Sequence, residues 1–428
     1  MPASEPRAAG LPPEFVFFFP YRPISGVPML FARIARALDA RGHRCTVIDY
    51  PDGCLSKQVA DRPGITRVAF TDGVPVSTNE NALIVMQSML PATMWDELQP
   101  PASARVLFWS LYAMNYVQFA VPLDWARHWQ SQSMRFQRFL NRTVLAGFQR
   151  TLGRFVAALV ARRSLAFMDG STWRAAADRL EVDLPRPSFV PVVVDVPDQN
   201  PRTTVPDGPL TATWLGRLDD FKIHILNHLV RTLDALATAR KTKMELAVIG
   251  DGPLAHLLVA PQGSWLTLRR CGTRSGQALT DELSRAHLHF AMGTSALEGA
   301  RLGVPTVLVD FAYGPVPDDY EFHWLAEAKD YELGRQIDDS MRGATSLATL
   351  GAIVDDVVAD GLRESATAYD YCRLHHSLDA GVTAFLAAAA QATYRYAEIP
   401  AEVRQKGIVR RTYERLRGRT PAAAAVAR

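Results

Sequence analysis

Residues 293–310 read GTSALEGARLGVPTVLVD: a flexible entry, a short helical segment and an apolar strand in immediate succession. The pair Gly303 and Pro305 ends the predicted helix, and the run at 305–310 has the continuous apolar character of a strand buried on both faces. One acid, Glu298, lies one turn into the helix. Two interpretations are open: Glu298 is a solvated surface acid, or it faces a binding site and holds a polar ligand.

The same alternation of strand and helix extends along most of the chain. Residues 27–43 place apolar side chains at helical spacing between two apolar runs, which predicts a β-α-β unit. A proline-rich, polar segment at 197–209 predicts a linker. Strands are predicted on both sides of it, at 14–19, 44–50, 82–87, 104–109, 164–169 and 188–195, and then at 211–216, 244–250, 265–270, 288–292 and 305–310. The pattern predicts an α/β protein with two doubly wound domains facing a cleft.

Composition excludes several classes of protein. The 428 residues are 48% hydrophobic and 21% charged with a formal net charge of +3, an ordinary soluble composition that argues against a dedicated nucleic-acid binder. Four scattered cysteines (Cys45, Cys54, Cys271 and Cys372) predict buried thiols rather than disulfides or a zinc site. We find no signal-peptide apolar segment and no run of about 18 apolar residues. We therefore expect a cytoplasmic protein.

Two cations follow the first strand of the second half, in the segment GRLDDFK (216–222). Arg217 and Lys222 flank a predicted turn into a helix, where ligands of doubly wound domains bind. Arginine binds a phosphate through two hydrogen bonds and lysine acts as a point charge, so the pair suits a diphosphate. The alternative is that Arg217 pairs with Asp219 or Asp220 on the surface, and both interpretations stay open.

Small residues at two other turns favour the close approach of an anion. The residues Gly293, Thr294 and Ser295 can cap a helix and present backbone N–H groups to phosphate, and Gly26 lies at a similar turn in the first half. A carboxylate such as Glu298 can accept hydrogen bonds from vicinal hydroxyls, which makes a ribose a natural partner. No G-x-G-x-x-G motif is present to indicate a dinucleotide site.

The ordered set of motifs resembles a known family. It consists of GRLDDFK (216–222), VIGDGP (248–253), CGT (271–273) and GTSALEGARLGVP (293–305), preceded by SGVPMLFARIARALDARGHRCTVI (25–48), FMDGSTW (167–173) and PVVVD (191–195). This order and spacing resemble the GT-B-fold glycosyltransferases, and most closely the group 1, or glycogen-synthase-like, family. The resemblance covers most of residues 15–400.

The resemblance implies a domain plan. It implies a Rossmann-like acceptor-binding domain at 1–196, the linker at 197–209 and a Rossmann-like nucleotide-sugar-binding domain at 210–377. A helix at 378–400 would cross back onto the first domain, and 401–428 would form a basic tail.

The resemblance also implies roles for individual residues. Arg217 and Lys222 would bind the donor diphosphate and neutralise the leaving group without a metal or cofactor. Glu298 would hold the donor ribose, and Thr294 and Ser295 would contact phosphate beside the turn residues Gly216 and Gly293. The backbone around Gly272 and Thr273 would meet the base of a UDP- or GDP-linked sugar, and Gly26 would let the first domain approach the donor.

One position departs from the family pattern. The family often has two glutamates eight positions apart; Glu298 matches the second, but Phe290 occupies the first slot. The acid that would contact the donor sugar is missing, so retention and inversion both stay open. No catalytic base is evident either, since the acceptor side offers only weak candidates: Ser110, Tyr112, Asn115, Asp124 and His128.

Residues 127–163 carry eight arginines interleaved with aromatic and aliphatic residues, and contain no acid. This composition is typical of a helix on an anionic bilayer. The alternative is a set of ordinary helices with an apolar core face and solvated arginines, and both stay open.

We therefore expect a glycosyltransferase acting on a glycan or lipid-linked acceptor, in bacterial cell-surface polysaccharide biosynthesis such as capsule or lipopolysaccharide. Through 127–163 it would be peripheral on the inner face of the membrane, and we expect no nucleic-acid partner. Two alternatives are a nucleotide-sugar epimerase of the same fold, which would need an acid/base pair beside the sugar, and a non-catalytic nucleotide-sugar-binding subunit.

Overall fold

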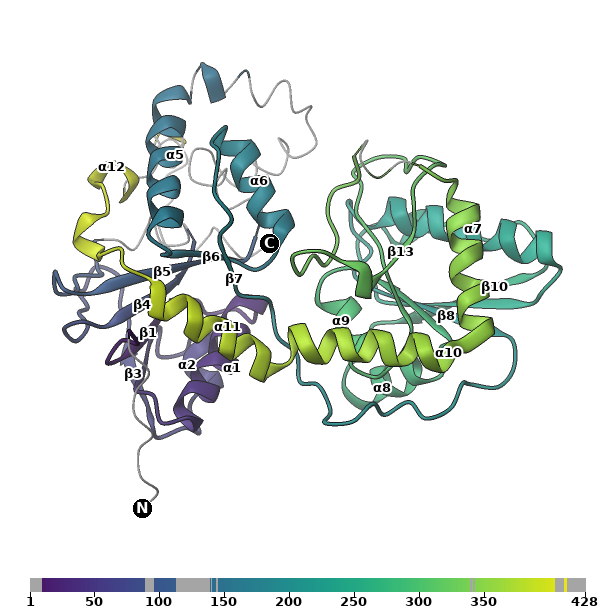
Figure 1. Cartoon of the computed structure of the whole chain (residues 1–428), viewed down its shortest axis with the longest axis horizontal. Helices are drawn as coiled ribbons and strands as arrows, with labels where there is room; N and C mark the ends of the chain where they lie inside the picture. The colour runs from purple at the N-terminus through teal and green to yellow at the C-terminus, as the bar shows by residue number, and fades with distance from the viewer. Residues whose placement is uncertain are drawn as a thin grey trace. The chain divides into compact units, whose positions relative to one another are not determined.

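The computed structural model describes residues 10–88, 96–112, 139, 141–143, 145–338, 341, 343–404 and 412–413. The chain forms two compact units (Figure 1). The first comprises Met1–Pro191 together with Gly381–Arg428, and the second comprises Val192–Ala380.

The first unit contains a seven-stranded parallel sheet in the order β3-β2-β1-β4-β5-β6-β7. Its strands are β1 (Phe15–Phe18), β2 (Cys45–Asp49), β3 (Ile65–Ala69), β4 (Leu83–Gln87), β5 (Arg105–Ser110), β6 (Leu165–Phe167) and β7 (Ser188–Phe189). Its helices are α1 (Gly26–Ala40), α2 (Cys54–Gln58), α5 (Ala146–Ala161), α6 (Gly170–Leu180), α11 (Leu378–Gln391) and α12 (Ala401–Arg404), with a 3₁₀ turn at Tyr396–Glu398.

Helices cover both faces of this sheet, which explains why its central strands are apolar throughout (Figure 1). Phe17 of β1 packs against Phe31 of α1 and Phe385 of α11. The alternate residues Val16 and Phe18 belong to the core cluster that includes α5 and α6. Residues 381–391, far from β1 in sequence, are thus part of the core of the first unit.

The second unit contains six strands in the order β10-β9-β8-β11-β12-β13, with only β13 antiparallel. They are β8 (Leu210–Leu215), β9 (Met244–Ile249), β10 (Leu266–Gly272), β11 (Leu288–Ala291), β12 (Thr306–Leu308) and β13 (His323–Trp324). The helices are α7 (Ile223–Arg240), α8 (Gly276–Ser284), α9 (Thr294–Ala300) and α10 (Ser346–His376), with 3₁₀ turns at Ala255–Leu257 and Leu325–Glu327.

Strand order decides where a ligand site can form in this unit. The chain runs from β8 outward to β9 and β10, and then returns to place β11 on the other side of β8. Such a reversal leaves a crevice at the carboxyl ends of the two central strands. Here those ends are Leu215 and Ala291, which are paired in register.

The predicted strand at 188–195 is wrong in length, because β7 stops at Phe189. Pro191 has no N–H to donate to a neighbouring strand, and Val194 instead donates its N–H to the carbonyl of His376. The four cysteines are buried and unpaired, which confirms the predicted free thiols.

The described part of 127–163 includes a helix with an apolar core face, as the alternative interpretation expected. The apolar residues of α5, including Leu152, Phe155 and Leu159, lie in the core of the first unit. Arg142 pairs with Glu181 and Arg162 pairs with Glu398. Residues 127–138, 140 and 144 lie outside the described residues, as do Asn115, Asp124 and His128. None of the described helices is both long and apolar enough to span a membrane.

Candidate functional site

The turn between β8 and α7 places two cations at the central strand end. Arg217 is exposed and Lys222 is half-buried, directly before the first residue of α7. Neither side chain has an ion pair among the described residues, so the predicted alternative of an Arg217–Asp219 or Arg217–Asp220 pair is not seen. Burial lowers the pKa of Lys222; the Asp219 carboxylate acts in the opposite direction and Arg217 in the same direction.

Two hydrogen-bond donors converge beside Gly216. A β-carbon built on Gly216 would lie 3.5 Å from Lys222 Nζ and 3.5 Å from Trp214 Nε1. The buried indole nitrogen of Trp214 has no acceptor among the described residues. The Lys222 ammonium lies over the face of Phe221, 5.4 Å from the ring centre. This turn therefore presents two cations that form no ion pair with any side chain of the described structure, although the Asp219 carboxylate acts to favour the charged form of Lys222.

The backbone of this turn is fixed by the neighbouring turn after β9. Gly216 donates its N–H to Ile249 and Leu218 donates to Asp251, at 3.0 and 3.1 Å. Gly250 has a φ of +136°, and a β-carbon there would lie 2.0 Å from the carbonyl oxygen of Gly216. Only glycine fits at such an approach, which gives a physical reason for the sequence VIGDG.

The turn between β11 and α9 lies beside the cationic turn because their strands are neighbours. Gly293 has a φ of +64° and donates its N–H to the carbonyl of Leu333 at 2.6 Å. Of the three residues predicted to cap the helix, Gly293 is the N-cap, and no side chain caps the helix. In the part of the chain that the structure describes, the N–H groups of Thr294 and Ser295 have no acceptor.

Glu298 is neither a free surface acid nor fully buried. Its side chain is 31% exposed, and its Oε2 accepts a hydrogen bond from Arg301 Nε at 2.7 Å. The other carboxylate oxygen has no partner among the described residues. One oxygen of Glu298 is thus held by the protein while the second is available to a ligand hydroxyl.

The remaining predicted residues lie further from this turn or in the other unit. Gly272 ends β10 and accepts a hydrogen bond from Gly250 N–H at 2.8 Å, while Thr273 is exposed. Both lie at the same edge of the sheet as Arg217, with β9 between them and β8. Gly26 is the exposed first residue of α1 in the first unit.

Phe290, which occupies the first slot of the family's glutamate pair, lies at a position unsuited to an acid. Its side chain is fully buried in the core of the second unit, in the middle of β11. The first slot of the glutamate pair is therefore a core position here, and an acid there would be buried without a partner. Ser110, another weak candidate, ends β5 with a buried hydroxyl that has no partner among the described residues.

A segment that sequence reasoning missed covers the ends of β11 and β12. Arg335 N–H donates to Asp310 Oδ1 at 2.8 Å, and Phe311 N–H donates to the Arg335 carbonyl at 2.9 Å. Burial raises the pKa of the Asp310 carboxyl, while the Arg335 N–H and the Tyr320 hydroxyl act against that rise. This segment brings Arg335 to the edge of the sheet that carries Arg217 and Lys222.

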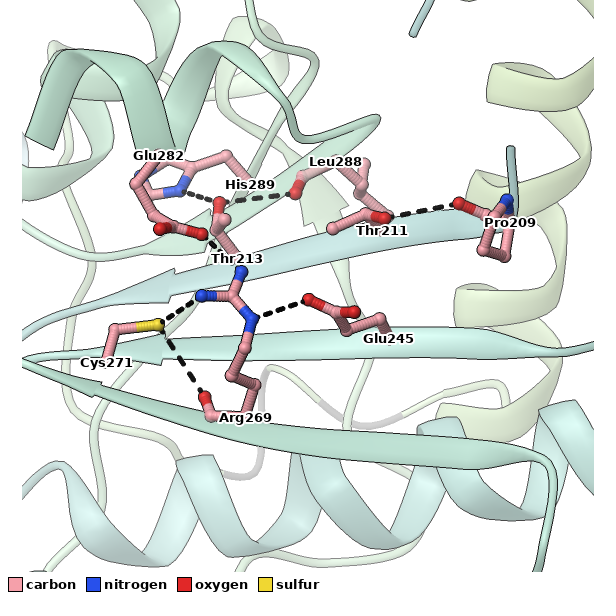
Figure 2. A network of polar contacts seen from close by, with 9 residues as sticks. All are labelled: Pro209, Thr211, Thr213, Glu245, Arg269, Cys271, Glu282, Leu288 and His289. Atoms are coloured by element: carbon pink, nitrogen blue, oxygen red, sulfur yellow. Dashed lines mark hydrogen bonds and ion pairs between the residues drawn. The ribbon is translucent and has the colours of Figure 1, made fainter. Parts of the chain in front are cut away.

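A second missed residue, His289, lies beneath α9 on β11. Figure 2 shows its ring directed at Thr213 of β8, with 2.9 Å between His289 Nδ1 and Thr213 Oγ1. Arg269 of β10 is held by Glu245 of β9 at 2.9 Å and by Glu282 of α8, and contacts Cys271 Sγ at 3.0 Å (Figure 2). Arg269 is therefore occupied within the protein and is a poor candidate for a ligand contact.

Across the described ranges, no group of three His, Cys, Asp or Glu side chains is placed to hold a metal ion.

No protein-family profile matches the chain, and no curated protein sequence matches it.

Solved structures do resemble this chain. One is a glycosyltransferase from Rickettsia africae ESF-5, with 12% identity, a TM-score of 0.51 and coverage of 88% of this chain and 97% of the other. Another is the apo form of the lipopolysaccharide outer core galactosyltransferase WaaB, with 10% identity, a TM-score of 0.52 and coverage of 88% and 98%. At this identity the likeness shows the fold alone. The chain has the α/β GT-B fold, with two Rossmann-like units.

Proposed function

We propose that this protein is a glycosyltransferase that moves a sugar from a UDP- or GDP-linked donor to a glycan or lipid-linked acceptor. The observation that carries the proposal is that Arg217 and Lys222, at the reversal of strand order in the second unit, form no ion pair among the described residues. The open N–H groups of Thr294 and Ser295 follow the adjacent strand. A diphosphate supplies acceptors for these two cations and for the open N–H groups.

The roles follow from the charge that develops during transfer. When the bond between sugar and diphosphate breaks, negative charge grows on the leaving phosphate, and fixed cations stabilise it. Lys222 and Arg217 are suited to that task, and we expect turnover to persist in EDTA. The free oxygen of Glu298 is suited to the ribose hydroxyls, while Arg301 holds its other oxygen.

A panel of nucleotide sugars tests the proposal. A ligand at 100 times its Kd stabilises the folded state by about 2.7 kcal/mol, so the correct donor raises the melting temperature. Arg217→Ala, Lys222→Met and Glu298→Gln should each reduce that rise while the ligand-free protein stays folded. A full rise in all three variants contradicts the site assignment.

A second candidate function is nucleotide-sugar binding without catalysis, and Phe290 favours it because the first acid of the family pair is absent. The two functions differ in product. With the identified donor and a preparation of bacterial lipid-linked saccharides, a transferase releases nucleoside diphosphate. A binding subunit gives the thermal shift and no release.

For the acceptor we propose bacterial cell-surface polysaccharide intermediates, reached by electrostatic contact with the inner membrane surface. The exposed arginines Arg150 and Arg154 of α5 have no ion pair among the described residues and line a hollow of about 980 Å³. Each exposed cation contributes about 1 kcal/mol at an anionic surface. Co-sedimentation with anionic vesicles should fall in the Arg150→Gln/Arg154→Gln variant; equal sedimentation of the two proteins contradicts this contact.

A further inference from the structure

His289 joins three elements of the second unit through one buried ring. It lies on β11; its Nδ1 is 2.9 Å from Thr213 Oγ1 on β8, and its Nε2 is 3.0 Å from the carbonyl oxygen of Ser295 in α9. The side chain is fully buried. A polar ring at such a position costs free energy unless both nitrogens are satisfied, and here they are.

The partners fix the protonation state of the ring. The carbonyl of Ser295 can only accept, so Nε2 carries the proton, and Nδ1 accepts from the Thr213 hydroxyl. Burial lowers the pKa of His289 to about 4, against the opposing effect of the Ser295 carbonyl. The ring is therefore neutral near pH 7 and acts through hydrogen bonds and packing, not through charge.

The ring also determines how α9 sits on the sheet. A β-carbon on Gly299 would lie 2.3 Å from His289 Cδ2, so the helix backbone packs directly on the ring. Ser295 and Gly299 precede and follow Glu298 on the same helix. A helix of seven residues has little stability of its own, so contacts of this kind decide its orientation.

We propose that His289 is a positioning residue that sets the direction of the Glu298 carboxylate toward the hydroxyls of a bound ribose. The inference rests on the proposed function, because it assigns Glu298 a ligand hydroxyl. If His289 were only a core residue, replacing it would change stability and leave the recognition of hydroxyls intact.

The test compares UDP and GDP with their 2′,3′-dideoxy forms, by isothermal titration calorimetry on the full chain. The measured quantity is the ratio of Kd for the dideoxy form to Kd for the ribose form. Hydrogen bonds to a charged group predict a ratio of about ten or more for the unaltered protein. Glu298→Gln should lower it to about two.

His289→Leu removes both hydrogen bonds and should lower the ratio to about three or less. His289→Gln keeps a donor for the Ser295 carbonyl and should restore most of it. The matched control is His228→Leu in the same unit, because His228 is also buried and bonds Ser346 Oγ at 2.7 Å. It should lower stability and keep the full ratio.

Each result decides one of the two claims. An unaltered protein that binds neither nucleotide, or binds with a ratio near one, overturns the proposed role of Glu298. A full ratio in His289→Leu, beside a lowered ratio in Glu298→Gln, overturns the positioning role alone. If His289→Leu does not fold, Thr213→Val carries the test: it should lower the ratio at least twofold while Thr213→Ser does not, and an unchanged ratio in Thr213→Val overturns the inference.

Discussion

Replacing Lys222 by methionine removes one positive charge from the candidate site and keeps the length of the side chain. The ammonium is half-buried and has no ion pair among the described residues. Because burial lowers its pKa, the charged form costs folding free energy that the variant no longer incurs. We expect Lys222→Met to be at least as stable as the unaltered protein, which separates a loss of binding from unfolding.

The solvent exposure of each cation sets a range for the expected increase in Kd when that cation is removed. A charge-assisted hydrogen bond from a partly buried donor contributes about 1.5–3 kcal/mol, which corresponds to about 10- to 150-fold in Kd for the nucleoside diphosphate. The exposed Arg217 is screened by solvent and should contribute about 0.2–1 kcal/mol, so Arg217→Ala should cost less than about fivefold. Added salt should reduce the Arg217 effect more than the Lys222 effect.

Calorimetric titration with UDP and GDP at low and high salt measures both effects. Lys243→Met is the matched control, because Lys243 is exposed and precedes β9 at the amino end of the same sheet. It should change Kd by less than about twofold. Equal Kd values for Lys222→Met and Lys243→Met would refute the reasoning, because the charge of Lys222 would then have no part in binding.

Gly299→Ala should destabilise the protein by about 1–3 kcal/mol, because the added methyl group would meet the His289 ring. Gly147→Ala should stabilise the protein slightly, because Gly147 lies on α5 with open space around its Cα. Urea unfolding measures both changes. Burial lowers the pKa of His228, His289 and His376 from 6.5 to about 4, so the unfolded chain protonates first and stability should fall as pH drops from 6.5 toward 4. Urea unfolding at successive pH values should show a smaller fall in His228→Leu, and an unchanged slope contradicts the cause. Arg301→Gln should lower the free energy of unfolding by less than about 0.5 kcal/mol, since its pair with Glu298 is partly exposed; a larger loss would mean that the pair is structurally essential.

Strand positions were predictable wherever a strand is buried on both faces. The runs at 82–87 and 244–250 correspond to β4 and β9. Short, continuous apolar runs of this kind are typical of strands that are buried on both faces. The strand β3 was not predicted, since it is an edge strand whose residues are mostly exposed and include Thr66 and Arg67. The two-residue strand β13 has no periodicity to detect.

The candidate site was predictable only where a turn follows a strong strand. Arg217 and Lys222 stand out because β8 precedes them directly. His289 does not stand out in the sequence, because a histidine within an apolar run is usually a core residue. Its hydrogen-bond partners, Thr213 and Ser295, are not adjacent to it in the sequence. The ion pair between Glu298 and Arg301 could have been predicted from the sequence, since residues three apart on a helix are neighbours.

The approach of Gly250 to Gly216 has a consequence for altering ligand preference. Gly250 accepts no side chain without moving the turn at Gly216, so variants that select a different base should not come from this position. The outer strand offers more freedom, because residues 273–275 are exposed and precede α8. Mutagenesis libraries aimed at changing the donor should therefore be concentrated there, where substitutions leave the central turns intact.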